Sequence, residues 1–164
     1  VGGNATFLLN IPPTREGLFH ANDVARLREL GEYLRNSYGT NLAEGARLTA
    51  SPAAPGHDID CARTADDAYY LPAAENGTAE MILRWDAPQT IRRVVLMEQL
   101  MCSQRVERFA IDAEVNGAWQ QAAEGTVIGH KRIVALQGVT AAAMRIRILD
   151  ARVAPTLRFI GVYA

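Results

Sequence analysis

The chain has 164 residues, enough for one domain with an appendage. Hydrophobic residues make up 49% and charged residues 21%, as in ordinary globular proteins. The net charge of −1 gives no general attraction to nucleic acid or to an anionic membrane, so we expect neither as a partner. No stretch approaches the roughly 20 apolar residues of a membrane-spanning helix, and the start without methionine or signal peptide indicates an interior cut of a longer polypeptide.

The first segment predicts a strand, a turn and a helix. Residues 5–11 form a short apolar block typical of a buried parallel strand, which the proline- and glycine-containing segment 12–17 ends. A helix is expected over residues 22–37, with Asn22 as N-cap. Its apolar stripe consists of Val24, Leu27, Leu30 and Leu34. Such a unit needs a sheet to cover its apolar face, so we expect a missing part upstream.

The pattern of residues 45–164 predicts an all-β domain. Residues 45–79 are rich in Ala, Pro, Gly and Asp and predict loops. From residue 80 onward, apolar residues alternate with polar ones, and turn signals recur every eight to twelve residues. Asp86-Ala87-Pro88 predicts a turn, and Asn116-Gly117 predicts a tight hairpin. Strands are expected within 81–85, 91–97, 109–115, 144–148 and 157–163. This spacing predicts a β-sandwich or jelly roll.

The first segment also carries a family resemblance. Asn10-Ile11-Pro12-Pro13 follows an apolar run that begins after Asn4, and the helix contains Leu30-Gly31-Glu32-Tyr33-Leu34. These motifs resemble the last strand, loop and helix of the catalytic barrel in glycoside hydrolase family 29, the α-L-fucosidases. The resemblance implies that residues 1–43 are a barrel fragment. It also implies that the parent protein is a retaining α-L-fucosidase, periplasmic or secreted.

Retaining fucosidases use two carboxylates about 5 Å apart. The resemblance places both on earlier barrel strands, so no residue of this chain is expected to be catalytic.

A second resemblance covers residues 44–164. The motifs that carry it are Ala65–Tyr70, Thr90–Glu98, Gln104–Phe109, Trp119 and Thr126–Ile133. They resemble the discoidin or coagulation-factor C-terminal type of galactose-binding-like sandwich, which includes carbohydrate-binding modules of family 32. The usual pattern has Trp at Tyr70 and Gly at Ser103. Family 32 modules often hold a structural Ca²⁺ near the last strand, but this chain ends Ile160-Gly161-Val162-Tyr163-Ala164 without a carboxylate, so no cofactor is required and Ca²⁺ stays an alternative.

Two sets of polar residues are candidates for shaping a sugar pocket. Glu98 ends one apolar strand and Arg105 begins the next after a loop that includes Gln104, so the carboxylate and guanidinium can pair bidentately. His130-Lys131-Arg132 follows Gly129 at an expected turn, where its donors can reach sugar hydroxyls or Glu98. The structural alternative for Glu98 and Arg105 is a buried ion pair that fixes the loop, and the alternative for residues 130–132 is a solvated basic turn.

Aromatic rings stack on sugar faces, and Tyr69 and Tyr70 lie in the loop-rich part, where a ligand can reach them. A core position is the alternative for both, and it is the expectation for Trp85, which alternates with Leu83. Asp66-Asp67 offers oxygen ligands for a cation, with a solvated turn as the alternative. Cys61 and Cys102 can form a disulfide in an exported protein or remain free thiols.

Three functions remain open from the sequence. The favoured one is a structural and substrate-shaping companion of the missing catalytic barrel of the same polypeptide, acting on fucosylated glycans, because a free-standing lectin would not carry the strand and helix expected within residues 4–38. The second is an autonomous carbohydrate-binding module for terminal galactose or fucose. The third is a discoidin domain that adheres to proteins or membranes, which the near-neutral charge disfavours.

Overall fold

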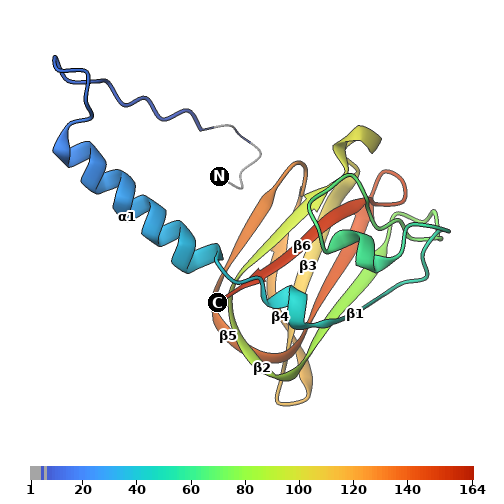
Figure 1. Ribbon diagram of the computed structural model, residues 1–164. Helices are drawn as coiled ribbons and strands as arrows, with labels where there is room; N and C mark the ends of the chain where they lie inside the picture. Colours follow the sequence, from blue (N-terminus) through green and yellow to red (C-terminus); the bar gives the residue numbers. More distant parts are fainter. Residues whose placement is uncertain (1–4, 6) are drawn as a thin grey trace.

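The computed structural model describes residue 5 and residues 7–164. This part of the chain contains a helix followed by a β-sandwich (Figure 1). The elements are α1 (Ala21–Tyr38), β1 (Arg47–Ala50), β2 (Ala79–Glu98), β3 (Val106–Val115), β4 (Ala118–Gly125), β5 (Arg132–Ala151) and β6 (Leu157–Tyr163), with 3₁₀ turns η1 (Leu42–Gly45), η2 (Ile59–Ala62) and η3 (Leu100–Cys102). The mainly β architecture confirms the fold class predicted from the alternating pattern.

Two long strands hold the sandwich together. The ladder runs β1-β2-β5-β3-β4, and β6 pairs with β2. All pairs are antiparallel. The first half of β2 pairs with β1 and with the second half of β5, whereas its second half pairs with β6 and with the first half of β5. The two strands therefore pass from one layer into the other, and a single curled sheet makes both layers.

The core lies between these layers and follows the period of two. Met81, Leu83 and Trp85 on β2 are buried while the residues between them are less so, and the second half of β5 repeats the pattern, whereas Phe109–Ala113 of β3 are buried on both faces of the sheet. The indole Nε1 of Trp85 donates to the carbonyl of Leu42 at 2.8 Å, which confirms its expected core position and ties η1 to the sandwich. The largest fully buried side chains are Tyr70, Phe109, Met81, Leu83, Ile91, Leu96, Ile111, Ile128, Met144, Ile146, Ile148 and Leu157.

The outer face of the β3–β5 pair carries an ion network. Asp112 is buried, and its carboxylate accepts hydrogen bonds from Arg145 Nε at 2.8 Å and from Arg147 Nε at 2.7 Å. Burial alone would raise the pKa of Asp112, but hydrogen bonds and charge from the two arginines outweigh it and lower the pKa. The Arg145 guanidinium also stacks over the ring of Trp119, 4.7 Å from its centroid.

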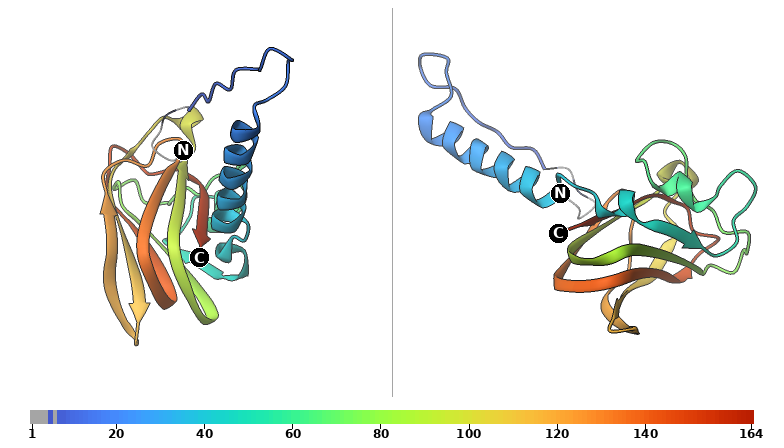
Figure 2. Two further views of the ribbon diagram at one scale, coloured as in Figure 1. Left: turned by 90° about the vertical axis from the view of Figure 1, so that its left-hand side faces the viewer. Right: turned by 60° about the horizontal axis from the view of Figure 1, so that its bottom comes forward.

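Helix α1 projects away from the sandwich (Figures 1 and 2). It begins one residue before the predicted start, and its N-cap is His20, whose Nδ1 accepts from the Asn22 N–H at 3.2 Å, rather than Asn22. At its carboxyl-terminal end, Tyr38 packs edge-on against Tyr163 with ring centroids 5.2 Å apart. No helix of the described residues combines the length and apolarity that crossing a bilayer requires.

Three predictions differ from the structure, and the first is the loop expected over residues 45–79, which contains strand β1. Residues 7–11 form no strand, because a strand needs a hydrogen-bonded neighbour and the rest of the described chain offers them none; Thr6, in the same expected strand, lies outside the described residues. The expected turn at Asp86-Ala87-Pro88 is a bend inside β2, where the β2–β5 register shifts between Arg84 and Gln89. The hairpin at Asn116-Gly117 is confirmed, with φ angles of 53° and 78°.

Candidate functional site at the loop end of the sandwich

The connecting loops gather at one end of the sandwich (Figure 1). Hydrogen bonds join them: Glu98 N–H donates to Gly129 O at 2.9 Å, Gln99 N–H donates to Thr156 O at 3.1 Å, and the Gln99 side chain donates to Asp67 O at 2.9 Å. The loops so linked are residues 51–78, 99–105, 126–131 and 152–156. Most of the residues singled out in the sequence therefore lie in one region, which we call the loop end.

Glu98 lies at the centre of the loop end as a buried carboxylate. Its Oε1 accepts from the backbone N–H groups of Arg105 at 2.7 Å and Val106 at 2.9 Å, and its Oε2 accepts from Gly129 N–H at 2.6 Å. The expected pairing with the Arg105 guanidinium is wrong. Backbone donors satisfy the carboxylate instead, so Glu98 fixes two loops and offers no free oxygen to a ligand.

The Arg105 guanidinium holds a different part of the loop end. Its Nε donates to Cys102 O at 3.0 Å and its Nη1 donates to Ala154 O at 2.7 Å. One side of the group borders a groove of ≈ 450 Å³. The groove is lined by Ala54, Leu71, Pro72, Ala73, Glu75, Arg105, Val153 and Ala154. Charged groups of both signs beside an apolar floor give this groove the means to orient a polar ligand.

Tyr69 and Tyr70 have opposite environments. Tyr69 is half-buried and its ring lies against that of His57, with centroids 4.3 Å apart. Hydrogen bonding to Cys102, and then burial, raise the pKa of its phenol. Tyr70 is fully buried, donates to Ser51 O at 2.9 Å, and has its pKa raised by burial. A ring without exposed surface cannot stack on a sugar, so the structure removes Tyr70 from the ligand candidates and leaves Tyr69.

The remaining predicted pocket residues lie on the rim. Gln104 and His130 are exposed, and Lys131 and Arg132 are partly exposed. Gly129, which precedes the basic turn, contacts Glu98 through its backbone N–H. The Nε of Arg132 is buried without a hydrogen-bond partner in the described part of the chain.

Asp66 and Asp67 lie exposed in the loop that precedes Tyr69. The Asp66 carboxylate accepts from the Thr64 hydroxyl at 2.7 Å and from Ala68 N–H at 2.9 Å, which together lower its pKa. Among residue 5 and residues 7–164, no cluster of three acidic, histidine or cysteine side chains could hold a metal ion. The Asp66-Asp67 cation site therefore stays a prediction, and so does the structural Ca²⁺ that the sandwich resemblance suggested near the last strand.

Sequence reasoning missed two residues that shape the loop end. Gln99 is buried, and its side chain bonds Asp67 O on one side while accepting from Met101 N–H at 3.3 Å on the other. Ser103 adopts φ 75° and ψ 164°, a backbone region that is essentially reserved for glycine. The departure from the family's usual Gly at this position was the one signal that the sequence offered. Cys61 and Cys102 are both free thiols.

Comparisons with known proteins agree with this architecture. No family model matches the chain. It is 28% identical over 169 residues to "Putative alpha-L-fucosidase 1" of Oryza sativa subsp. japonica, covering 99% of this chain and 33% of that protein. It is 25% identical over 171 residues to "Alpha-L-fucosidase 1" of Arabidopsis thaliana, covering 99% and 34%. The chain thus spans about a third of the length of the curated relatives it matches.

Solved structures extend the similarity to the arrangement in space. A putative alpha-L-fucosidase from Bacteroides thetaiotaomicron matches with a TM-score of 0.90 and 26% identity, over 99% of this chain and 37% of that one. A Ruminococcus gnavus GH29 fucosidase in complex with fucose matches with a TM-score of 0.88 and 27% identity, over 99% and 34%. The CBM32-1 and CBM32-2 domains of Clostridium perfringens ZmpB match with a TM-score of 0.70 at 12% identity, over 83% and 38%, which shows the fold alone.

Both expected resemblances are confirmed. The chain is similar over nearly its whole length to the carboxyl-terminal part of α-L-fucosidases, including a GH29 fucosidase of known structure, and its folded domain has the discoidin-like β-sandwich fold.

Proposed function

We propose that this chain is the non-catalytic carboxyl-terminal companion of an α-L-fucosidase barrel in the same polypeptide. The parent reaction is the hydrolysis of terminal α-L-fucosyl residues of glycans with retention. The names of the matched relatives support the activity, and the share of their length that this chain covers leaves room for a catalytic domain. The partner barrel, the glycan substrate and a periplasmic or secreted location all belong to this proposal.

The observation that carries the proposal is the open apolar face of α1. Leu30 is 44% exposed, Tyr33 55% and Leu34 41%, although their spacing makes them one stripe. The segment that precedes the helix exposes further large apolar side chains, namely Phe7, Leu8, Leu9, Leu18 and Phe19. A contiguous surface of this kind marks an interaction site. A barrel sheet alongside residues 7–11 and α1 would cover it and give the apolar segment its strand neighbours.

The buried carboxylates support a non-catalytic role. Retaining glycosidases need two carboxyl groups that face a sugar from about 5 Å apart. Glu98 is saturated by three backbone N–H groups, and Asp112 is held by Arg145 and Arg147 on the outer face of the sheet. Neither carboxylate has an oxygen available to attack or protonate a glycosidic bond.

The test is binding to a barrel supplied in trans. The catalytic region of a family 29 α-L-fucosidase, cut before the part that this chain matches, is co-expressed with the tagged chain. We expect the barrel to co-purify and to hydrolyse 4-nitrophenyl α-L-fucoside. Leu30→Glu with Leu34→Glu should abolish co-purification, whereas Arg28→Glu with Glu32→Lys, on the charged side of the same helix, should not. Equal recovery with both double variants would contradict the proposal.

A second candidate function, an autonomous carbohydrate-binding module, is favoured by the loop-end groove. Arg105 and Glu75 border it, and Tyr69 remains partly exposed in the neighbouring loop. Calorimetric titration of the chain with L-fucose, galactose and fucosylated oligosaccharides separates the two functions. Saturating heat that Tyr69→Ala or Arg105→Ala removes would establish a sugar-binding module. No heat at millimolar sugar would leave the companion role alone.

A further inference from the structure

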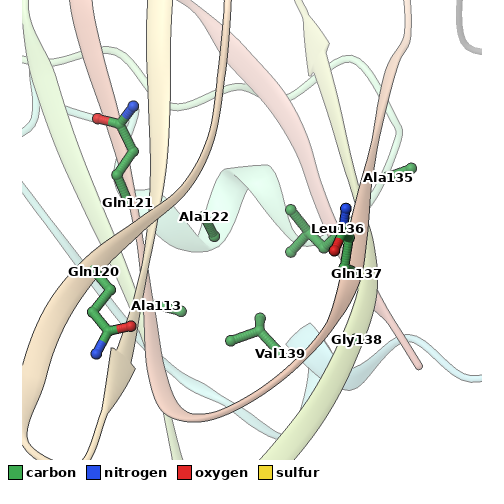
Figure 3. A pocket seen from close by; sticks show the side chains of 9 residues that line it. All are labelled: Ala113, Gln120, Gln121, Ala122, Ala135, Leu136, Gln137, Gly138 and Val139. Carbon is green, nitrogen blue, oxygen red and sulfur yellow. The ribbon is translucent and has the colours of Figure 1, made fainter.

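A second groove lies away from the loop end, at the open seam of the sandwich. Strand β4 is an edge strand paired only with β3, and residues 132–135 of β5 pair with β2 on one side only. The space between these two edges is a groove of ≈ 480 Å³, within the range of about 300–1,000 Å³ that is usual for small-ligand sites. Figure 3 shows its lining. The lining residues are Ala113, Gln120, Gln121, Ala122, Ala135, Leu136, Gln137, Gly138 and Val139.

β-bulges shape both walls of this groove. On β4, Ala122 is the extra residue, because Ile111 pairs with Ala123 while Asp112 pairs with Gln121. On β5, residues 136–138 stand opposite a single residue of β2, and Gly138 has φ 79°. Bulges occur preferentially at edges and beside functional sites, and they prevent another strand from adding to an edge. A peptide strand therefore cannot extend the ladder here, and recognition rests on side chains.

The lining chemistry selects the class of ligand. None of the lining residues is Asp, Glu, Lys or Arg, so the wall itself offers a charged ligand no countercharge, and the Arg92 guanidinium lies outside the wall, beside Gly138. The amides of Gln120 and Gln137 come from opposite walls, and neither has a hydrogen-bond partner in the described part of the chain (Figure 3). Each amide provides one acceptor and two donors, which match hydroxyl groups that both donate and accept. Ala113 and Val139 supply an apolar surface beside them.

We propose that the seam groove binds a neutral oligosaccharide, with the amides of Gln120 and Gln137 on its hydroxyls and its C–H surface against Ala113 and Val139. This site is separate from the loop end and does not depend on the proposed barrel. It contains no aromatic platform, so the affinity should be weak, with a dissociation constant on the order of 1 mM.

The experiment is a ¹H–¹⁵N NMR titration of the 164-residue chain with 2′-fucosyllactose, lactose, maltotriose and cellotriose, and with 3′-sialyllactose as the charged comparison. At least one neutral sugar should shift the side-chain amide signals of Gln120 and Gln137. Replacing both residues by alanine should weaken binding roughly tenfold, because two hydrogen bonds of modest net strength are lost. Asn36→Ala, which removes an exposed amide on α1 that lines neither groove, is the matched control and should leave the affinity unchanged.

Three results would overturn the proposal. One is the absence of shifts in this groove with every neutral sugar at tens of millimolar. Another is a set of shifts confined to the loop end, which would assign sugar binding to the groove beside Arg105. The third is an unchanged affinity in the double alanine variant. Equal urea midpoints of the variants and the unmodified chain establish that the comparison is between folded proteins.

Discussion

Replacing Glu98 by glutamine should destabilise the sandwich far more than the loss of one charge on the surface would. The carboxylate accepts three backbone N–H groups, two on Oε1 and one on Oε2. In Glu98→Gln one oxygen becomes an NH₂ group, so at least one N–H faces another donor. Hydrogen bonds to charged groups contribute about 1.5–3 kcal/mol, so the substitution should cost about 2–4 kcal/mol of the free energy of unfolding.

Glu98→Ala removes all three acceptor contacts at a position that is 1% exposed. Each orphaned donor costs about 1–3 kcal/mol, so a loss of about 4 kcal/mol or more is expected. That is a large share of the roughly 5–15 kcal/mol by which domains are usually stable. Either variant should also speed the hydrogen exchange of the Val106 and Gly129 amides, because their acceptor is lost.

Urea unfolding followed by tryptophan fluorescence measures these losses as shifts of the midpoint at constant slope. Glu75→Gln makes the same chemical change at an exposed position and should move the stability by less than about 0.5 kcal/mol. If Glu98→Gln were as stable as Glu75→Gln, the carboxylate would not be what holds the loops together, and the reasoning would fail.

Three further outcomes are expected. Ser103→Gly should raise the free energy of unfolding by about 1 kcal/mol, because glycine adopts φ 75° without strain; a lower urea midpoint would contradict this. Gly125→Ala should cost about 1–3 kcal/mol, since its Cβ would lie 2.5 Å from the Phe109 ring; an unchanged melting temperature would show that the ring can move. The pKa of Asp112 is lower in the folded than in the unfolded chain, so its contribution to the free energy of unfolding is complete above the ordinary aspartate pKa and is lost as the pH falls through the lowered pKa. Below about pH 4, the free energy of unfolding of Asp112→Asn should therefore depend less steeply on pH than that of the unmodified chain. Parallel pH dependences of the two proteins would exclude the effect.

Local patterns in the sequence were sufficient for much of β2, β3 and β6 and for the Asn116-Gly117 hairpin, but not for β1 or for the first half of β5. The alternation of Met81, Leu83 and Trp85 identified the buried face of β2, and Asn116-Gly117 identified the hairpin, because both signals depend on neighbouring residues alone. The continuity of β2 through Asp86-Ala87-Pro88 could not be predicted in this way. It depends on β5, which pairs with the strand on both sides of the bend.

The position of the candidate site could be predicted from the sequence, but the hydrogen-bond partners of its residues could not. The strand ends at Glu98 and Arg105 indicated where the loops meet, yet carboxylate, guanidinium and backbone donors compete for the same partners. Only the folded geometry decides that Glu98 takes amide donors while the Arg105 guanidinium takes the carbonyls of Cys102 and Ala154. Tyr70 is buried while Tyr69 is half-buried. Tyr70 exchanges two backbone hydrogen bonds with Leu157 of β6, a contact between distant residues that the loop sequence does not reveal.

The junction between α1 and the sandwich has a consequence for the order of folding. The Asn41 side chain accepts from Val162 N–H at 2.9 Å, and Tyr163 packs on Tyr38, so residues more than a hundred positions apart set the direction of the helix. A ribosome produces β6 last among the elements of this structure, so α1 emerges long before the strand that orients it. Tyr38 and Asn41 therefore gain their partners only when β6 adds to β2, so the direction of α1 relative to the sandwich is fixed in the last step of folding.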